Sequence, residues 1–185
     1  IPLFTLLIVF PEAFINILFG SEFLVASNAL RFLAIGALFH SIFSISNRLI
    51  IMLGRSKIIL ADMVVLGIVN IILNIILIPK YGINGAAIAT MLSMISLNLI
   101  FAYQAYKYLG IIPLRKKMIN ILSISIFCTL VLILIKQLIE INVLSLILIG
   151  GVFLGLYVAL IFATNSWDKN DKLIINLIKE KLLRN

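Results

Sequence analysis

Residues 70–93 read NIILNIILIPKYGINGAAIATMLS, and this stretch determines the kind of fold that the chain adopts. Before Pro79 it is a run of Ile and Leu interrupted by Asn70 and Asn74, and after Gly82 it is rich in small side chains. Proline breaks a helix, and the lysine beside it avoids lipid. The stretch therefore predicts two apolar helices joined by a short turn.

The composition of the whole chain agrees with this stretch. Of its 185 residues, 63% are apolar and 12% are charged, whereas soluble domains are about 45–50% apolar and about 25% charged. A chain of this size has too much surface to bury so many apolar side chains away from water. Its single cysteine, Cys128, cannot form an internal disulfide. We therefore expect an all-α integral membrane protein.

Apolar runs of about 20 residues, the length that crosses a bilayer, recur along the chain between Pro, Gly and charged residues. We expect five complete spans after a truncated N-terminal one, which would rise only about 15 Å. Because the chain starts without Met, we expect it to be the C-terminal piece of a longer protein. The predicted segments are a partial span at 1–10, an interfacial turn at 11–28, spans at 29–53, 58–78, 83–106, 118–135 and 144–163, and an amphipathic tail helix at 164–185.

Basic residues gather in alternate connections between the predicted spans. The connections at residues 54–57, 107–117 and 164–185 together carry +8, whereas the other three together carry −1. Lys and Arg concentrate in the cytoplasmic loops of membrane proteins. We therefore expect a multi-pass protein of the cell membrane whose C-terminus and basic loops are cytoplasmic.

Polar side chains in the span at 29–53 share one side of the helix, within an arc of about 140°. A charge in lipid costs about 3 kcal/mol, so each needs a partner or a water-filled cavity. We interpret the stripe as the lining of an aqueous cavity, with helix packing alone as the alternative. Arg31 lies on the opposite side, where it can snorkel to the outer interface. The stripe consists of Gly36, Ala37, His40, Ser41, Ser44, Asn47 and Arg48.

The span at 58–78 carries a weaker polar arc of Asp62, Gly67, Asn70 and Asn74. Asp62 and Arg48 both lie a turn or two inside the cytoplasmic boundary of consecutive spans. We predict that they form an ion pair with a structural or gating role. The sequence does not decide whether Asp62 or His40 couples transport to a Na⁺ or H⁺ gradient.

Two ridges of small side chains predict close helix packing, because such residues let another helix approach. The first begins in the turn before the span at 83–106, and the second lies in the span at 144–163. Their members are Gly82, Gly85, Ala89 and Ser93 in the first ridge, and Gly151 and Gly155 in the second.

Residues 70–93 resemble the C-terminal half of polysaccharide and oligosaccharide flippases of the multidrug, oligosaccharidyl-lipid and polysaccharide exporter superfamily. There, an Asn-containing span ends in Pro and leads through a Gly-rich turn into Gly-Ala-Ala-x-Ala-Thr. The segments PEAFINILFGSEF at 11–23 and LGRSK at 53–57 also resemble that family. The resemblance covers residues 1–106, and residues 107–185 match only in having two more spans and a basic tail.

This resemblance implies a plan of 12 to 14 spans, in which two lobes enclose a central cavity and residues 1–106 form most of the C-terminal lobe. It implies translocation of a polyprenyl- or dolichyl-linked glycan by alternating access, without a cofactor. Membrane lipid and the missing N-terminal half of the same protein would be the partners. A cation attracts a pyrophosphate and amides bind hydroxyls, which suits the cavity candidates His40, Ser44, Asn47, Arg48, Asn70 and Asn74.

Other classes fit the residues less well. An enzyme acting on a lipid pyrophosphate needs clustered carboxylates or metal ligands, and the predicted spans hold only Asp62 and His40, so we expect neither an enzyme nor a metal site. Nucleic-acid binding has no support because the basic residues flank spans. A drug or cation antiporter of the same superfamily and a non-transporting membrane scaffold remain as alternatives.

Overall fold

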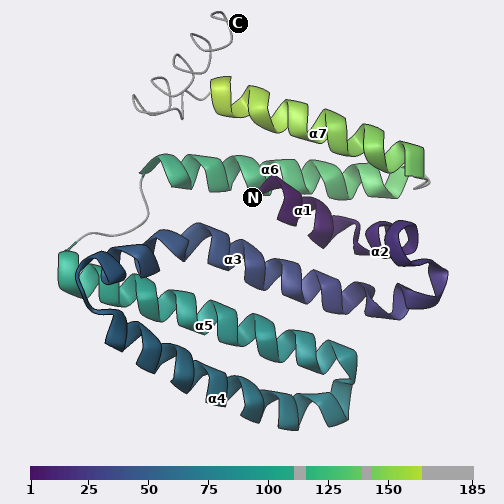
Figure 1. Ribbon diagram of the computed structural model, residues 1–185. Coiled ribbons are helices and arrows are strands. Elements are labelled where there is room, and N and C mark those ends of the chain that lie inside the picture. The colour runs from purple at the N-terminus through teal and green to yellow at the C-terminus, as the bar shows by residue number, and fades with distance from the viewer. Residues whose placement is uncertain (111–115, 139–142, 164–185) are drawn as a thin grey trace, which may run out of the picture.

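The computed structural model describes residues 1–110, 116–138 and 143–163, and these form helices joined by short connections, without a β-strand (Figure 1). The predicted tail helix at 164–185 and part of the basic loop at 107–117 lie outside the described residues. The elements are α1 (Pro2–Val9), α2 (Pro11–Phe19), the 3₁₀-helix η1 (Ser21–Ala26), α3 (Ser27–Met52), α4 (Ser56–Tyr81), α5 (Ile83–Leu109), α6 (Lys116–Leu138) and α7 (Val143–Ala163).

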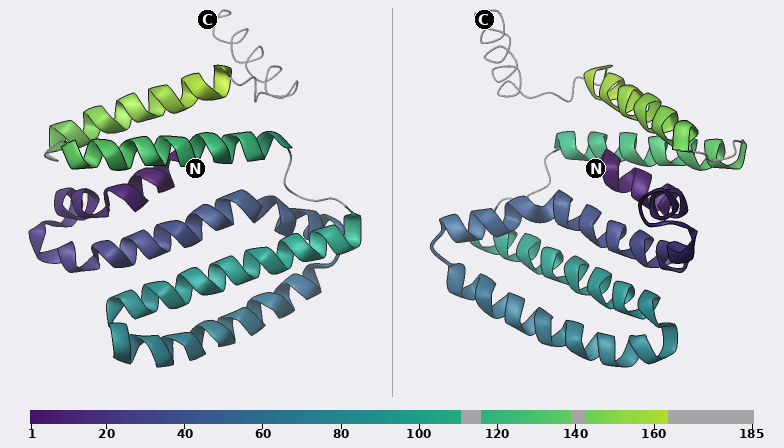
Figure 2. Two further views of the ribbon diagram at one scale, coloured as in Figure 1. Left: turned by 180° about the vertical axis from the view of Figure 1, so that it is seen from behind. Right: turned by 45° about the vertical axis from the view of Figure 1, so that its right-hand side comes forward.

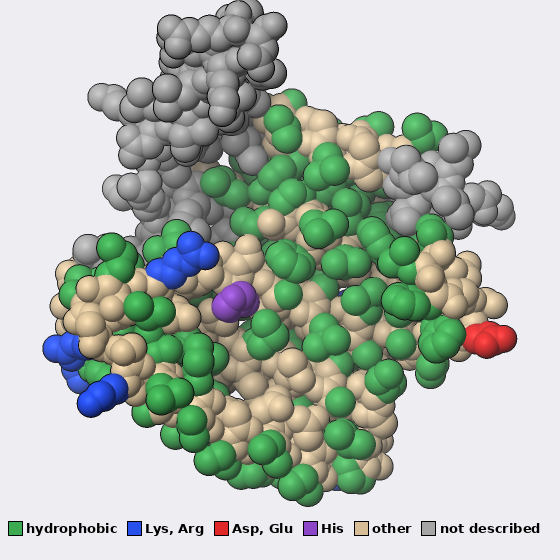
Figure 3. Space-filling view, in the orientation of Figure 1, with side chains coloured by type: hydrophobic (Ala, Val, Ile, Leu, Met, Phe, Trp, Pro, Cys, Tyr) green, Lys and Arg blue, Asp and Glu red, His purple; other side chains and the backbone are tan. Residues whose placement is uncertain are grey.

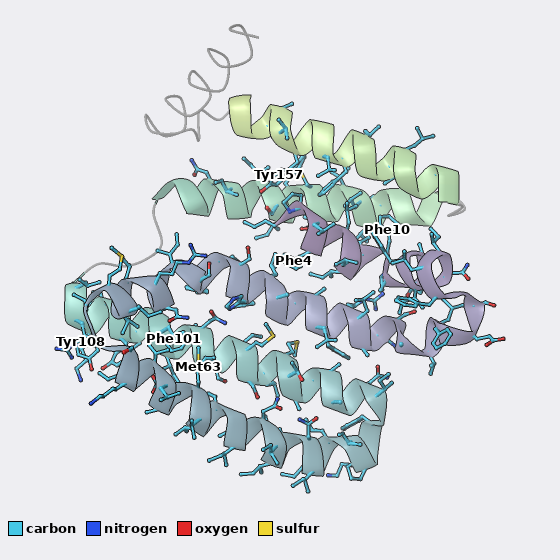
Figure 4. The ribbon with its side chains drawn as sticks, in the orientation of Figure 1. Phe4, Phe10, Met63, Phe101, Tyr108 and Tyr157 are labelled. Carbon is cyan, nitrogen blue, oxygen red and sulfur yellow. The ribbon has the colours of Figure 1, made fainter. Side chains whose placement is uncertain are left out.

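The helices form two groups that meet along α1 and α3 (Figures 1 and 2). In the first group, α5 lies between α3 and α4 and packs against both, whereas α3 and α4 touch only slightly. Its core includes Ile50, Ile59 and Phe101. In the second group, α1 packs on α6 and α7, and Phe10 and Tyr157 lie in its core (Figure 4).

A sharp bend separates α1 from α2. Pro11 has no N–H to donate to the preceding turn, so α1 ends before it and Phe10 takes a non-helical conformation, with φ −119° and ψ 46°. Proline is well suited to the first turn of a new helix, and α2 begins there. The two helices meet at an angle of 87°. The chain thus changes direction where the predicted interfacial turn begins.

The predicted interfacial turn at 11–28 is helical in the structure. Residues of α2 and η1 fill it, and only Gly20, with φ 95°, interrupts them. The apolar side chains of this segment are mostly exposed, among them Phe19 at 66% and Phe23 at 54%. The segment predicted as an interfacial turn is thus largely helical in the structure.

The α4–α5 hairpin follows from the stretch at 70–93. α4 continues through Pro79 and ends at Tyr81, slightly beyond the predicted end of that span. Gly82 then adopts φ 55° and ψ −132°, a backbone conformation that costs little only for glycine. Its N–H donates to the carbonyl of Ile78 at 2.8 Å, which closes the end of α4.

Within the described residues, three helices, α3, α4 and α5, are long and apolar enough to cross a membrane, or four if the bent pair α1–α2 counts as one span. At 26 residues, α3 is about 39 Å long, against about 30 Å of hydrocarbon. The described apolar parts of α6 and α7 are shorter, at Ser123–Leu134 and Leu148–Leu160. The number of five complete spans therefore stays a prediction.

α4 buries only Ile59 and Leu66 and exposes most of its Ile and Val side chains, as expected of a helix that faces lipid.

Candidate functional site

The polar stripe of α3 lies mostly on the surface of the described structure. His40, Ser41 and Arg48 are exposed, and Ser44 and Asn47 are half-buried. His40, the only histidine of the chain, is visible on the face drawn in Figure 3, halfway along α3. The stripe is therefore turned away from the core of its own helical group, as the lining of a cavity between two lobes would be.

One end of the stripe packs against α5 instead. Gly36 is buried, and a Cβ added to it would lie 3.2 Å from the Cα of Met91 on α5. The small side chain lets α3 and α5 approach closely at this point. Packing, the alternative interpretation of the stripe, thus applies to its Gly36 end.

Two oxygens beside the exposed stripe lack a partner. Ser46 is fully buried, and neither its Oγ nor the buried Oδ1 of Asn47 has a hydrogen-bond partner among the described residues. Buried polar atoms are rarely left unpaired. Ser44, by contrast, donates to the carbonyl of Ser41 at 3.4 Å. The part of α3 around Ser46 and Asn47 therefore has oxygen atoms that could accept hydrogen bonds but receive none from the described residues.

Asn70 joins α4 to α5, and Asn74 bonds Asn70 from the next turn of α4. Asn70 Nδ2 donates to Ser93 Oγ at 3.1 Å, and Asn74 Nδ2 donates to the carbonyl and the Oδ1 of Asn70 at 2.9 and 3.0 Å. Both asparagines are half-buried. Polar bonds between helices stabilise helix association in membranes. The structure thus gives Asn70 a bond between helices, and Asn74 a bond that holds the Asn70 amide.

Asp62 has a different partner from the predicted one. Gln104 Nε2 of α5 donates to Asp62 Oδ2 at 2.6 Å. Arg48 is exposed and forms no ion pair with Asp62 within the described part of the chain. The reason is the order of the helices: α5 lies between α3 and α4, so Asp62 faces α5 (Figure 1). The predicted ion pair is therefore not formed in this structure.

Arg31 holds the bend between α1 and α2 rather than snorkelling freely. Its Nε donates to the carbonyl of Ile8 at 3.0 Å, and its guanidinium pairs with Glu12 at 3.2 Å and bonds Asn28 at 3.3 Å. A cation at the C-terminus of α1 and a carboxylate at the N-terminus of α2 both match the helix dipoles. The sequence does not predict this contact, because Arg31 lies on α3, far along the chain from Pro11 and Glu12.

The first small-residue ridge lies at close contacts over most of its length. A Cβ on Gly85 would overlap the carbonyl oxygen of Leu77 in α4, Ala89 is fully buried, and Ser93 bonds Asn70. Gly82 instead forms the turn, and open space surrounds the position of its absent Cβ.

The second ridge faces away from the neighbouring helices. Neither Gly151 nor Gly155 would place a Cβ within 4 Å of another group, and both are exposed. At about 100° per residue, they lie on the side of α7 opposite to Phe153 and Tyr157, which are buried in the second core. Among the described residues no helix lies against this ridge, and the packing predicted for it stays a prediction.

Charges separate toward the two ends of the long helices. Arg48, Arg55 and Lys57 lie near the junction of α3 and α4, while Glu12 and Glu22 lie toward the opposite end of α3. Figure 3 shows basic side chains on one side of the molecule and acidic colour on the other. The guanidinium carbon of Arg55 lies 3.9 Å from the ring centre of Tyr108, a cation–π contact that ties the α3–α4 turn to the end of α5.

The described surface also holds apolar pockets. The larger one, about 500 Å³, lies among α2, η1, α3 and α5, and includes Phe19, Leu33 and Thr90. Another, about 250 Å³, lies between α6 and α7 beside Cys128. In the part of the chain that the structure describes, no three His, Cys, Asp or Glu residues gather as metal ligands.

Comparisons with known proteins extend these observations. The chain is 35% identical over 181 residues to the membrane protein MJ1068 of Methanocaldococcus jannaschii, which is itself uncharacterized, and this match covers 96% of the chain and 36% of the relative. It is also 35% identical over 111 residues to the probable low-salt glycan biosynthesis flippase Agl15 of Haloferax volcanii, covering 60% of the chain and 24% of that relative. No protein-family profile matches the chain, and no solved structure does.

The two matches and the long apolar helices together indicate the class of protein. The chain is a helical membrane protein that is similar to a glycan biosynthesis flippase. It spans about a third of the length of the first relative and about a quarter of the second.

Proposed function

We propose that the chain is part of a flippase that moves lipid-linked oligosaccharide or polysaccharide precursors across the cell membrane. The observation that carries this proposal is the similarity to Agl15, which is described as a glycan biosynthesis flippase. It agrees with the resemblance of residues 70–93 to the exporter superfamily. The protein would act as a transporter rather than an enzyme, with two lobes giving alternating access to a site near the midplane.

The exposed stripe of α3 supports an anionic, hydroxyl-rich cargo. Arg48 and His40 are exposed on it, and Ser44 and Asn47 accompany them. A guanidinium binds phosphate oxygens through strong, charge-assisted hydrogen bonds, and Ser and Asn bind sugar hydroxyls. A polyprenyl- or dolichyl-linked glycan would place its phosphate and sugars along this stripe while its lipid tail stays in the bilayer. The remaining segments of the protein would supply the other wall of the cavity.

Replacing Arg48 by alanine in the full-length gene product is expected to weaken binding of a lipid-linked glycan pyrophosphate at least about tenfold. The reason is that a hydrogen bond to a charged group contributes about 1.5–3 kcal/mol. Binding to the purified protein in detergent measures the effect, and Lys57→Ala, an exposed basic residue outside the stripe, serves as control. Binding that depends on Asp62→Asn but not on Arg48→Ala would instead favour a drug or cation antiporter.

We also propose that the junction of α3 and α4, the basic loop at 107–117 and the C-terminus face the cytoplasm, because they carry the positive charge. In a Cys128→Ser background, a cysteine replacing Ser21 is expected to react with an impermeant thiol reagent on intact cells. A cysteine replacing Ser56 is expected to react only after the membrane is permeabilised. Both serines are exposed, so accessibility of the side chain is matched. The opposite labelling pattern would reverse the proposed orientation.

A further inference from the structure

Two cations come together where the α3–α4 turn meets the end of α5. The guanidinium carbon of Arg55, in that turn, lies 3.9 Å from the ring centre of Tyr108 in the last turn of α5 (Figure 4). Lys107 is the neighbour of Tyr108 along α5. It comes three residues after Gln104, which bonds Asp62 of α4, so Lys107 lies on the side of α5 that faces α4. Arg55 and Lys107 therefore stand at the same end of the α4–α5 contact.

Neither cation has an acidic partner. Both side chains are exposed, and neither forms an ion pair within the described part of the chain. Asp62, the single acidic residue of α4, accepts a hydrogen bond from Gln104 instead, and α5 holds no acidic residue. This end of the bundle therefore carries positive charge that the described residues do not neutralise.

The contact with Tyr108 prepares Arg55 to bind an anion. A guanidinium that lies over an aromatic ring is held in place by its face. Its N–H donors point outward from its edge, where they match two oxygens of one phosphate group. Arg55 is exposed beside the half-buried Tyr108, so this edge is accessible. The pair thus offers a positioned donor group for a phosphate.

Apolar side chains surround this positive end. Met52 and Leu53, directly before the turn, are 83% and 41% exposed, and Tyr103 and Tyr106 of α5 are exposed as well. Tyrosines are enriched where a membrane protein passes from hydrocarbon to head groups. A molecule that offers both an anionic head and apolar chains would cover the cations and the apolar side chains together, and a membrane phospholipid has both parts.

Lys57 stands close to Arg55 in sequence but on another side of α4. At about 100° per residue it lies about 160° around the helix from Ile59, which is buried against residues of α3 and α5. Lys57 is exposed and has the same charge. It is therefore a matched control for Arg55.

We propose that Arg55 and Lys107, with Tyr108 behind the guanidinium, bind the phosphate head group of an anionic phospholipid whose chains cover Met52 and Leu53. The guanidinium and the ammonium group donate hydrogen bonds to the phosphate oxygens. Basic pockets between helices near the membrane surface bind anionic head groups in this way. Because one cation comes from the α3–α4 turn and the other from α5, the lipid joins the two segments. The inference rests neither on the proposed cargo nor on the proposed orientation.

Native mass spectrometry of the purified full-length gene product, titrated with phosphatidylglycerol or phosphatidylcholine, tests the site. Phosphatidylglycerol is expected to bind more tightly than phosphatidylcholine. Arg55→Gln and Lys107→Gln are each expected to weaken phosphatidylglycerol binding about tenfold, because each removes a charge-assisted hydrogen bond, and Lys57→Gln is expected to leave it unchanged. Equal weakening by Arg55→Gln and Lys57→Gln would overturn the proposal, because the lipid would then respond only to the overall charge.

Tyr108→Leu separates positioning from charge. It keeps both cations but removes the ring that holds the guanidinium, so phosphatidylglycerol binding is expected to weaken by less than in Arg55→Gln. Binding that is as tight in Tyr108→Leu as in the wild type would contradict the role of the ring.

Two further measurements identify the occupant. Inorganic phosphate in excess is expected not to displace phosphatidylglycerol, because it has no chains to cover Met52 and Leu53, and displacement would overturn the assignment to a lipid. Phosphatidylglycerol is expected to raise the unfolding free energy of the wild type more than that of Arg55→Gln, since it binds the folded wild-type protein more tightly. An equal rise in both proteins would contradict the site. Lipid binding through Arg55 without any glycan translocation would leave this site standing while the proposed flippase function failed.

Discussion

Replacing Gly85 by alanine is expected to destabilise the α4–α5 hairpin by about 3 kcal/mol. An added Cβ would overlap the carbonyl oxygen of Leu77, and backbone atoms cannot move aside as the end of a side chain can. Overpacking of this kind costs about 1–3 kcal/mol, and contact with backbone places it at the upper end. The free energy of unfolding of the full-length gene product in mixed micelles measures the change.

Gly67→Ala is the matched control for this prediction. Gly67 lies in α4, and nothing stands within 4 Å of the position that its Cβ would take. Alanine favours a helix over glycine by about 1 kcal/mol, so this variant is expected to be as stable as the wild type or more so. If Gly85→Ala behaves like Gly67→Ala, the close approach of α4 and α5 is not present in the protein.

Replacing Arg31 by alanine is expected to destabilise the protein by about 2 kcal/mol. The carbonyl of Ile8 would lose its donor, and a hydrogen bond to a charged group contributes about 1.5–3 kcal/mol. The ion pair with Glu12 adds less, because the two side chains are 34% and 47% exposed, and exposed pairs contribute about 0–1 kcal/mol. The unfolding free energies of Arg31→Ala, Glu12→Gln and the double variant separate the two contributions.

Arg48→Ala is the control for stability, since Arg48 lies on the same helix, is exposed, and has no ion pair among the described residues. It is expected to unfold like the wild type. A coupling free energy between Arg31 and Glu12 well above 1 kcal/mol would show that the ion pair, and not the bond to Ile8, holds the bend. Equal stability of Arg31→Ala and Arg48→Ala would argue against the contact altogether.

The long apolar runs predicted the positions of α3, α4 and α5 to within a few residues. Hydropathy works here because a helix in lipid must be apolar over its whole length. Pro11 marks the bend between α1 and α2. The second change of direction does not fall at Pro79, which lies inside α4, but at Gly82. The angle between α1 and α2 could not be predicted, since it depends on Arg31, which comes from a helix later in the chain.

Side-chain partners were harder to predict than helices. Spans that are consecutive in the sequence need not be neighbours in space. The prediction that pairs Asp62 with Arg48 assumes that they are, and therefore does not include Gln104. A signal was present: Asp62 and Gln104 stand at similar distances in sequence from the Gly82 turn, so a hairpin brings them together. A stripe of small residues such as Gly151 and Gly155 does not say which side of its helix packs, because larger residues on the opposite side can decide this.

Asn70 and Asn74 illustrate the same difficulty for the candidate site. Amides inside a span suit a sugar cargo, but they equally suit a protein neighbour. In the structure Asn70 bonds Ser93 of α5, and Asn74 bonds Asn70 within α4. His40 and Arg48 differ because they are exposed on α3. The exposed part of the stripe is therefore the stronger candidate for contact with cargo.

Restoring the full-length gene to a strain that lacks its glycan flippase tests the central claim most directly. The measurement is the amount of surface glycan, with the inserted protein quantified in the same membranes. We expect the wild-type gene to return surface glycan, and Arg48→Ala to return less at equal protein level. A protein that is inserted and stable but leaves the surface without glycan would contradict the proposed flippase function.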